Sequence, residues 1–148
     1  MDLITVKELY KNREQYFDKE VTVGGWVRSN RDSKTFGFIV VNDGSYFENI
    51  QVIYDSDIIN FEEISKYRVG ASVKVYGKVV LTPENKQPFE IHAINVELLG
   101  DSPEDYPIQP KRHTKEFLRE QAYLRTRTNL FGAVFRVRSV AAHAIHTF

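Results

Sequence analysis

The chain of 148 residues contains no cysteine, and this absence excludes disulfide bonds, thiolate nucleophiles and cysteine-ligated zinc. No segment approaches the roughly 20 uncharged apolar residues that a membrane-spanning helix requires. The first residues, 1–4, lack the basic region and apolar run of a secretory signal. We therefore expect a cytoplasmic protein without a membrane partner.

Neither sign of charge is in excess, because 20 basic residues balance 20 acidic ones. The balance conceals a difference between the two parts of the chain. Residues 1–110 carry 12 basic and 18 acidic groups, whereas residues 111–148 carry 8 basic and 2 acidic groups. The first part is therefore acidic, and any binding of nucleic acid there must come from a local basic patch.

Apolar residues alternate with polar ones in five short segments, which predicts five strands. The first begins at Glu20, and the others lie at 35–41, 49–54, 71–81 and 88–98. A turn at 42–45 follows the second strand, and a loop at 82–87 joins the last two. The capping pattern and apolar spacing predict a helix at 5–17 and another at 56–67, between the third and fourth strands.

A short motif occurs twice and indicates that the sheet closes on itself. Val21-x-Val23-x-Gly25-x-Val27 recurs as Val73-x-Val75-x-Gly77-x-Val79, and the adjoining pair Gly24-Gly25 predicts a bulge or sharp bend. Five bent strands with a helix between the third and fourth are typical of the OB-fold, an all-β barrel that commonly binds oligonucleotides. An SH3-like barrel is the alternative, but it gives no reason for the inserted helix.

The last third of the chain has a different character. Three of the five prolines lie at 103, 107 and 110, so we expect a barrel over residues 1–100 and a linker over 101–114. Residues 115–148 then form a helical segment, in which Thr114 and Asn129 are the predicted N-caps. The apolar stripe of the last helix has no partner in the sequence and no C-cap, so we interpret the chain as part of a longer protein.

Positive and aromatic residues meet between the first two strands, where Arg28, Arg31 and Lys34 lie near Phe36 and Phe38. Single-stranded nucleic acid needs cations for its phosphates and flat rings for its bases. A solvated loop beside core phenylalanines is the alternative interpretation. The facing of Arg31, beyond the glycine bend, stays open.

The alternation of the strands favours the nucleic-acid interpretation. If Ile39, Ile50 and Phe89 face the core, then the side chains of Phe38, Gln51 and Glu90 face outward. An amide can pair with the edge of a base, and a carboxylate can accept hydrogen bonds from guanine. These three residues are therefore candidates for base recognition.

Other chemistries lack the residues they need. His143 and His146 are three positions apart on the last predicted helix, but no further ligand lies near them, so no metal site is predicted. The sequence has no glycine-rich phosphate loop and no catalytic serine or cysteine arrangement. We expect no catalytic residue and no cofactor in these 148 residues.

Several segments of the chain resemble asparaginyl-tRNA synthetase, a class II aminoacyl-tRNA synthetase of the aspartyl, asparaginyl and lysyl subgroup. The segments similar to its anticodon-binding domain are Gly25–Ile39, Asn42–Ser45 and Ile50–Val52. The segments similar to its hinge and to the entry of its catalytic domain are Tyr106–His113, Glu116–Arg119 and Leu124–Asn129. The segment Phe131–Arg138 resembles the start of its motif 1 helix. The resemblance covers essentially the whole chain.

This resemblance implies a function and roles for particular residues. The intact enzyme would use ATP and Mg²⁺ to attach asparagine to tRNA(Asn) through an asparaginyl-adenylate, and the barrel would bind the anticodon loop of that tRNA rather than DNA. Phe38 would stack on an anticodon base, Gln51 would read the central uridine, and Glu90 would read the guanine or modified guanine at the first position. Arg28 and Arg31 would hold the anticodon.

The resemblance also implies that the intact enzyme is a homodimer and that this chain alone is not catalytic. Phe131, Val134, Val137 and Ala141 of the motif 1 helix would contact the second subunit. Motifs 2 and 3 are absent, so the chain alone should not aminoacylate. Two alternatives stay open: a stand-alone OB-fold protein that binds single-stranded nucleic acid, and the anticodon domain of a relaxed-specificity aspartyl-tRNA synthetase.

Overall fold

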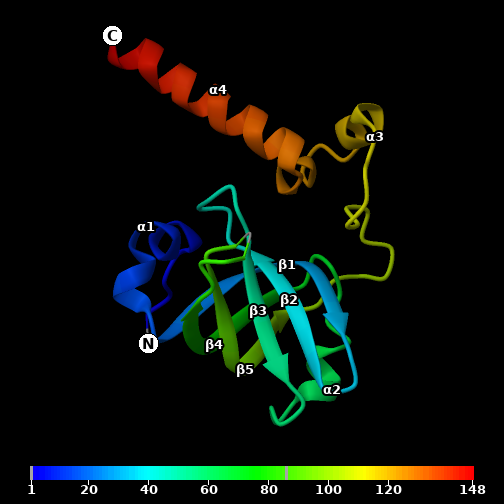
Figure 1. Cartoon of the computed structure of the whole chain (residues 1–148). Helices are drawn as coiled ribbons and strands as arrows, with labels where there is room; N and C mark the ends of the chain where they lie inside the picture. The colour runs from blue at the N-terminus through cyan, green and yellow to red at the C-terminus, as the bar shows by residue number, and fades with distance from the viewer. Residues whose placement is uncertain (1, 86) are drawn as a thin grey trace. The chain divides into compact units, whose positions relative to one another are not determined.

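Five strands close into a barrel in the computed structural model, which describes residues 2–85 and 87–148 (Figure 1). The strands are β1 (Glu20–Asp32), β2 (Phe36–Asn42), β3 (Ile50–Asp55), β4 (Ser72–Leu81) and β5 (Phe89–Gly100). They are ordered β1-β2-β3-β5-β4, and β4 pairs again with β1. The contact of β3 with β5 is parallel, and the other four strand contacts among the described residues are antiparallel. The OB-fold prediction is confirmed; Met1 and Lys86, which the predicted barrel and its last loop include, lie outside the described residues.

The core lies inside the barrel and is made by alternate residues of its strands, as the sequence predicts. Ile39, Ile50 and Phe89 are fully buried. Their chain neighbours Phe38, Gln51 and Glu90 are only half-buried, so these side chains lie on the opposite, outer side. The two faces of the strands are therefore assigned correctly from the sequence.

Helix α1 (Val6–Tyr16) covers one end of the barrel with its buried residues Val6 and Leu9. Its predicted N-cap is confirmed, because the Thr5 hydroxyl accepts a hydrogen bond of 3.2 Å from the Glu8 amide. Figure 1 shows the helix beside the barrel, near the N-terminus.

The second predicted helix is wrong in length. Instead of a helix over 56–67, the structure has a single turn, α2 (Phe61–Ile64). Ile59 is fully exposed, and the Asn60 side chain donates to the Val96 carbonyl 2.9 Å away. A contact with the barrel therefore holds the residue before α2, and of the apolar residues Ile58, Ile59, Phe61 and Ile64 in the predicted helix only Ile64 is buried.

The repeated valine and glycine motif belongs to two strands that pair with each other. Val23 lies opposite Val75, and each motif glycine, Gly25 or Gly77, lies opposite the first valine of the other motif. The predicted bulge is displaced, because the irregularity in β1 lies between Val27 and Ser29 rather than at the glycines. Gly25 is needed for close packing instead: an added Cβ would lie 2.7 Å from the Val41 Cγ1 atom.

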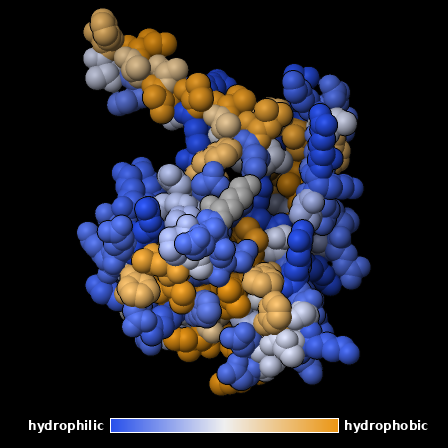
Figure 2. All heavy atoms as spheres, in the orientation of Figure 1, coloured by the Kyte–Doolittle hydropathy of each residue, from blue (hydrophilic) through white to orange (hydrophobic). Residues whose placement is uncertain are grey.

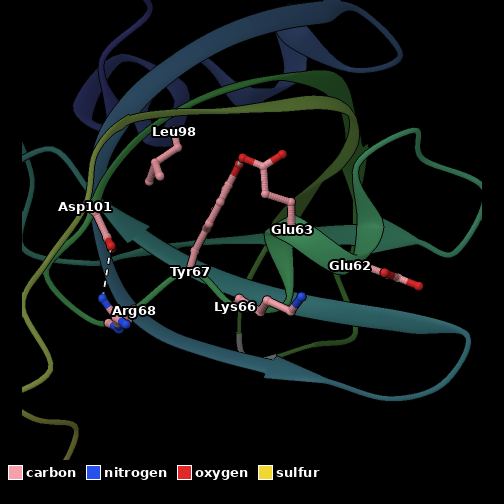
Figure 3. Close-up of a pocket in the computed structure, with 7 residues that line it drawn as sticks. All are labelled: Glu62, Glu63, Lys66, Tyr67, Arg68, Leu98 and Asp101. Atoms are coloured by element: carbon pink, nitrogen blue, oxygen red, sulfur yellow. Dashed lines mark hydrogen bonds and ion pairs between the residues drawn. The ribbon is translucent and has the colours of Figure 1, made fainter.

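Residues 101–106 continue the barrel unit, which ends at Tyr106. The Arg68 guanidinium donates to Asp101 at 3.0 Å and to Glu104 at 3.2 Å (Figure 3 shows the first contact). Gly70 has a φ of +91°, and an added Cβ there would lie 2.7 Å from the Tyr106 ring. The first part of the predicted linker is therefore packed on the barrel.

The second unit runs from Pro107 to Phe148. It contains α3 (Lys115–Glu120), the 3₁₀ turn η1 (Arg125–Arg127) and α4 (Asn129–Thr147). Thr114 caps α3 as predicted, but α4 is capped by Thr128 and not by Asn129. Thr128 has the extended backbone that an N-cap needs, and its hydroxyl accepts from the Phe131 amide.

Tyr54 gives the barrel a testable dependence on pH. Burial, and then the charge of Asp32, raise the pKa of this tyrosine from 10.0 to about 12, and its hydroxyl donates to Asn30. The unfolded chain loses this proton near pH 10, but the folded chain keeps it to about pH 12. The stabilisation is therefore complete below pH 10 and is lost between these values, by about 1.4 kcal/mol per pH unit for this one group.

We expect Tyr54→Phe to lower the free energy of unfolding at neutral pH by about 1 kcal/mol, the usual value of one hydrogen bond. Between pH 10 and pH 12 its stability should fall less steeply than that of the unchanged chain. Denaturant unfolding at a series of pH values measures both slopes. Equal slopes would contradict the assignment, since Tyr10 and Tyr67 remain in both chains.

Candidate nucleic-acid interface

The outer face of β1, β2, β3 and β5 carries two adjacent rows of side chains. In the first row Arg31 lies opposite Phe38, Phe38 lies opposite Ile53, and Ile53 lies opposite His92. Partners in a ladder point to the same side of a sheet, so Arg31 shares the outer face with Phe38. The pairing thus settles the facing of Arg31.

The second row lies two residues away from the first on each strand, so its side chains are also on the outer face. Ser29 lies opposite Val40, and Val40 lies opposite Gln51. The row continues to Glu90 on β5, because the Gln51 Nε2 atom donates to the Glu90 Oε1 atom at 2.9 Å. Neighbouring strands are about 4.8 Å apart, so four strands present these groups over about 14 Å.

The two remaining cations lie at the edge of this face. Arg28 is half-buried at the irregularity of β1, which lies between the buried Val27 and the half-buried Ser29. Lys34 is exposed in the short connection between β1 and β2. All three predicted cations therefore lie on β1 or its following loop, on one side of the two rows.

Phe36 and Phe38 form an aromatic pair on the outer face. Their ring centroids are 5.2 Å apart and their planes are inclined by 83°, an edge-to-face contact. Phe36 is 40% exposed, and neither ring belongs to the core of the barrel. The interpretation of these phenylalanines as core residues is wrong, because the β2 alternation places Gly37, Ile39 and Val41 inside.

A hollow of about 530 Å³ opens beside the second row, between the loop before β3 and the loop before β5. It is lined by Tyr10, Val40, Glu48, Asn49, Gln51, Asn85, Gln87, Pro88 and Glu90. Two carboxylates and four amide side chains thus surround a space that is large enough for a nucleobase. Gln51 and Glu90, which the sequence predicts separately, lie on the same wall.

Sequence reasoning missed the residues that come from the loops and from α1. Tyr10 donates from its hydroxyl to the Asn49 carbonyl at 2.8 Å, and burial, with the nearby Glu48 and Tyr46, raises its pKa to about 12. Its hydroxyl proton is therefore used by the Asn49 carbonyl. Asn85 and Gln87 lie outside any periodic segment, so no alternation could have placed them at the site.

A second hollow, of about 420 Å³, lies near α2 and is drawn in Figure 3. Its wall includes Glu62, Glu63 and Asp101, and the Tyr67 hydroxyl donates to Glu63 at 3.2 Å. Arg68 is already paired with Asp101. None of the residues that line this hollow belongs to the two rows, so we assign the nucleic-acid interface to the two rows and the first hollow.

The predicted subunit contacts lie on α4, none of whose residues is buried. Val134, Val137 and Ala141 are exposed, and Phe131 is half-buried with the Arg125 guanidinium 5.0 Å from its ring centroid. Figure 2 shows hydrophobic atoms along this helix. The apolar stripe of α4 therefore has no cover within its own unit.

Within residues 2–85 and 87–148, no three His, Cys, Asp or Glu side chains are grouped so that they could hold a metal ion. Over the same residues, none of the helices combines the length and the apolar character needed to cross a membrane.

Comparison with known proteins agrees with this geometry. The chain is 59% identical over 149 residues to an asparagine–tRNA ligase of Acholeplasma laidlawii and 56% identical over 148 residues to one of Clostridium novyi. Both alignments cover 100% of this chain and 32% of the relative, so the chain spans about a third of the length of these relatives.

Two solved structures share the fold. An asparaginyl-tRNA synthetase from Pyrococcus horikoshii complexed with asparaginyl-adenylate has a TM-score of 0.83 at 21% identity, over 99% of this chain and 34% of that one. A putative aspartyl-tRNA synthetase from Leishmania major has a TM-score of 0.85 at 18% identity, over 99% and 31%. The tRNA anticodon family model, described as an OB-fold nucleic acid binding domain, matches residues 21–99, more than half of the chain. The chain therefore belongs to the family of OB-fold nucleic acid binding domains.

Proposed function

We propose that the chain is the anticodon-binding module of an asparaginyl-tRNA synthetase and that its partner is the anticodon loop of tRNA(Asn). The observation that carries the proposal is the outer face of the barrel, where an aromatic ring, an amide and a carboxylate lie in adjacent rows beside a hollow that can admit a base. The high identity to asparagine–tRNA ligases along the whole chain supports the choice of amino acid.

Each side chain has a role in this proposal. Phe38 stacks on an anticodon base, because its ring lies on the outer face and stacking needs an accessible ring. Gln51 contacts the central uridine and Glu90 the guanine, or a modified guanine, at the first position, since amides and carboxylates match the edges of these bases. Arg28 and Arg31, at the side of the rows, hold the phosphates.

Aminoacylation belongs, in this proposal, to the part of the relatives that the chain does not span. The intact enzyme uses ATP and Mg²⁺ to form an asparaginyl-adenylate and transfers asparagine to tRNA(Asn) in the cytoplasm. Mg²⁺ is usually held by one or two carboxylates together with the phosphates of its substrate, so the proposal places the ion with the ATP, outside this chain. The uncovered stripe of α4, including Phe131, Val134, Val137 and Ala141, contacts a second copy in the homodimer.

Binding of RNA hairpins by the 148-residue chain tests the proposal. We expect a hairpin with the asparagine anticodon to bind more tightly than a hairpin with a changed central base and than an unstructured strand of the same composition. Affinity should fall as salt rises, because phosphate contacts release counterions. Equal binding of all three RNAs would favour instead a stand-alone protein that binds any single strand.

The variant Arg31→Ala distinguishes a contact with the RNA backbone from recognition of a base. We expect this variant to bind every hairpin more weakly by a similar factor and to reduce the salt slope by about one, because a phosphate contact carries no sequence information. Fluorescence anisotropy at several salt concentrations measures both effects. A loss confined to one hairpin sequence would show that Arg31 contacts a base instead.

A further inference from the structure

The hydrogen bond between Gln51 and Glu90 fixes which end of the Gln51 amide faces the carboxylate. A carboxylate only accepts hydrogen bonds, so the amide nitrogen, and not its oxygen, must face Glu90. The structure has this arrangement, with the Nε2 atom 2.9 Å from the Oε1 atom. The amide oxygen and the second N–H bond of Gln51 then remain for a ligand.

The backbone brings these two side chains together. β3 and β5 run parallel, and their register pairs Val52 with Ile91 and Ile53 with His92. The preceding residues on the two strands are Gln51 and Glu90, both half-buried and both on the wall of the hollow. The contact is therefore built into the closure of the barrel.

The orientation of an amide matters because uracil and cytosine present their hydrogen-bond donor and acceptor in opposite order. Uracil offers an N–H donor beside a carbonyl acceptor, whereas cytosine offers a ring-nitrogen acceptor beside an amino donor. An amide that can rotate by half a turn can match either base, since its oxygen and nitrogen exchange places. An amide held in one orientation matches only one of them.

We propose that Glu90 is a positioning residue for Gln51, and that it makes the barrel select uridine over cytidine at the base that Gln51 contacts. The inference rests on the proposed function and adds a second role for Glu90, which acts on the central base through Gln51 besides contacting the first base. Removing the carboxylate should therefore alter recognition at both positions, whereas removing the Gln51 side chain should alter recognition at one.

Glu90→Gln is the decisive variant because it keeps the length of the side chain and its capacity to form hydrogen bonds. A glutamine at this position can either accept from Gln51 or donate to it, so the orientation is no longer fixed. Glu97→Gln is the matched control: it makes the same change of charge on the same strand, where Glu97 pairs with Lys74 at 3.5 Å.

Affinities for two hairpins that differ only in uridine or cytidine at the central anticodon position decide the question. We expect the unchanged chain and Glu97→Gln to prefer uridine by a factor on the order of ten or more, the effect of one unpaired polar group. In Glu90→Gln the ratio should approach one. Both hairpins keep the same first-position base, so loss of the contact of Glu90 with that base lowers both affinities by the same factor and cancels from the ratio. A general defect of the fold would likewise weaken both hairpins equally and leave the ratio unchanged.

The other outcomes each count against the inference. A uridine preference that persists in Glu90→Gln overturns it and leaves the proposed function standing. Equal strengthening of both hairpins would mean that the Gln51–Glu90 contact only closes the site, which also overturns it. If the unchanged chain shows no preference at this position, both the inference and the proposed reading of the anticodon fail.

Discussion

Replacement of Phe38 by alanine is expected to weaken hairpin binding by about 5- to 150-fold, which corresponds to the 1–3 kcal/mol that a base stacked on an aromatic ring usually contributes. The ring lies on the outer face of β2 and touches Phe36 edge-on, so its loss opens no cavity in the core. The barrel should therefore still unfold cooperatively. Titration of labelled hairpin and thermal unfolding measure the two properties on the same variant.

Two further variants control this result. Phe38→Tyr keeps a flat ring and should bind hairpins nearly as well as the unchanged chain. Ile59→Ala removes an apolar side chain that is fully exposed beyond β3, and it should change neither binding nor stability. A Phe38→Ala chain that has lost its cooperative transition would instead show that the ring supports the fold, and the stacking role would be abandoned.

A large loss of stability is expected from Gly77→Ala. An added Cβ would collide with the His92 carbonyl oxygen and lie 2.8 Å from the Ile91 Cγ2 atom. β4 cannot move away, because at this residue it pairs with β5 on one side and with Val21 of β1 on the other. We expect a loss of about 3 kcal/mol in the free energy of unfolding, at the upper end of the cost of overpacking.

Gly24→Ala is the matched control, since Gly24 also lies in a barrel strand. The nearest atom to its added Cβ, Leu3 Cδ2, is 3.5 Å away, an ordinary contact. This variant should be as stable as the unchanged chain or slightly more stable, because alanine restricts the unfolded state. Equal denaturation midpoints for the two variants would show that β5 yields locally. In that case Glu90, on the same strand, should also shift and hairpin binding should change.

The faces of the strands could be predicted because each strand has one buried side. Alternation alone placed Ile39 and Ile50 inside and Phe38 and Gln51 outside, and the structure agrees. A period of two is a property of the strand itself and needs no knowledge of its neighbours. The candidate residues for base recognition therefore came from the sequence.

Features that depend on contacts between distant segments could not be predicted. The facing of Arg31 follows from its pairing with Phe38, and the bond between Gln51 and Glu90 follows from the parallel register of β3 and β5. The predicted length of α2 was wrong because the Asn60 side chain donates a hydrogen bond to the backbone of β5, which the local sequence pattern cannot reveal. Asn85, in a loop, reaches the hollow for similarly non-local reasons.

The packing of residues 101–106 determines where the chain can be cut when the barrel is moved into another protein. A chain shortened after Gly100 loses the Tyr106 ring from its place over Gly70 and leaves Arg68 without both of its acidic partners. Water would then reach Gly70, where the intact chain has the Tyr106 ring, which is only 9% exposed. A barrel that ends at Tyr106 retains these contacts. The boundary for such a transfer therefore lies between Tyr106 and Pro107 rather than at Gly100, the end of β5.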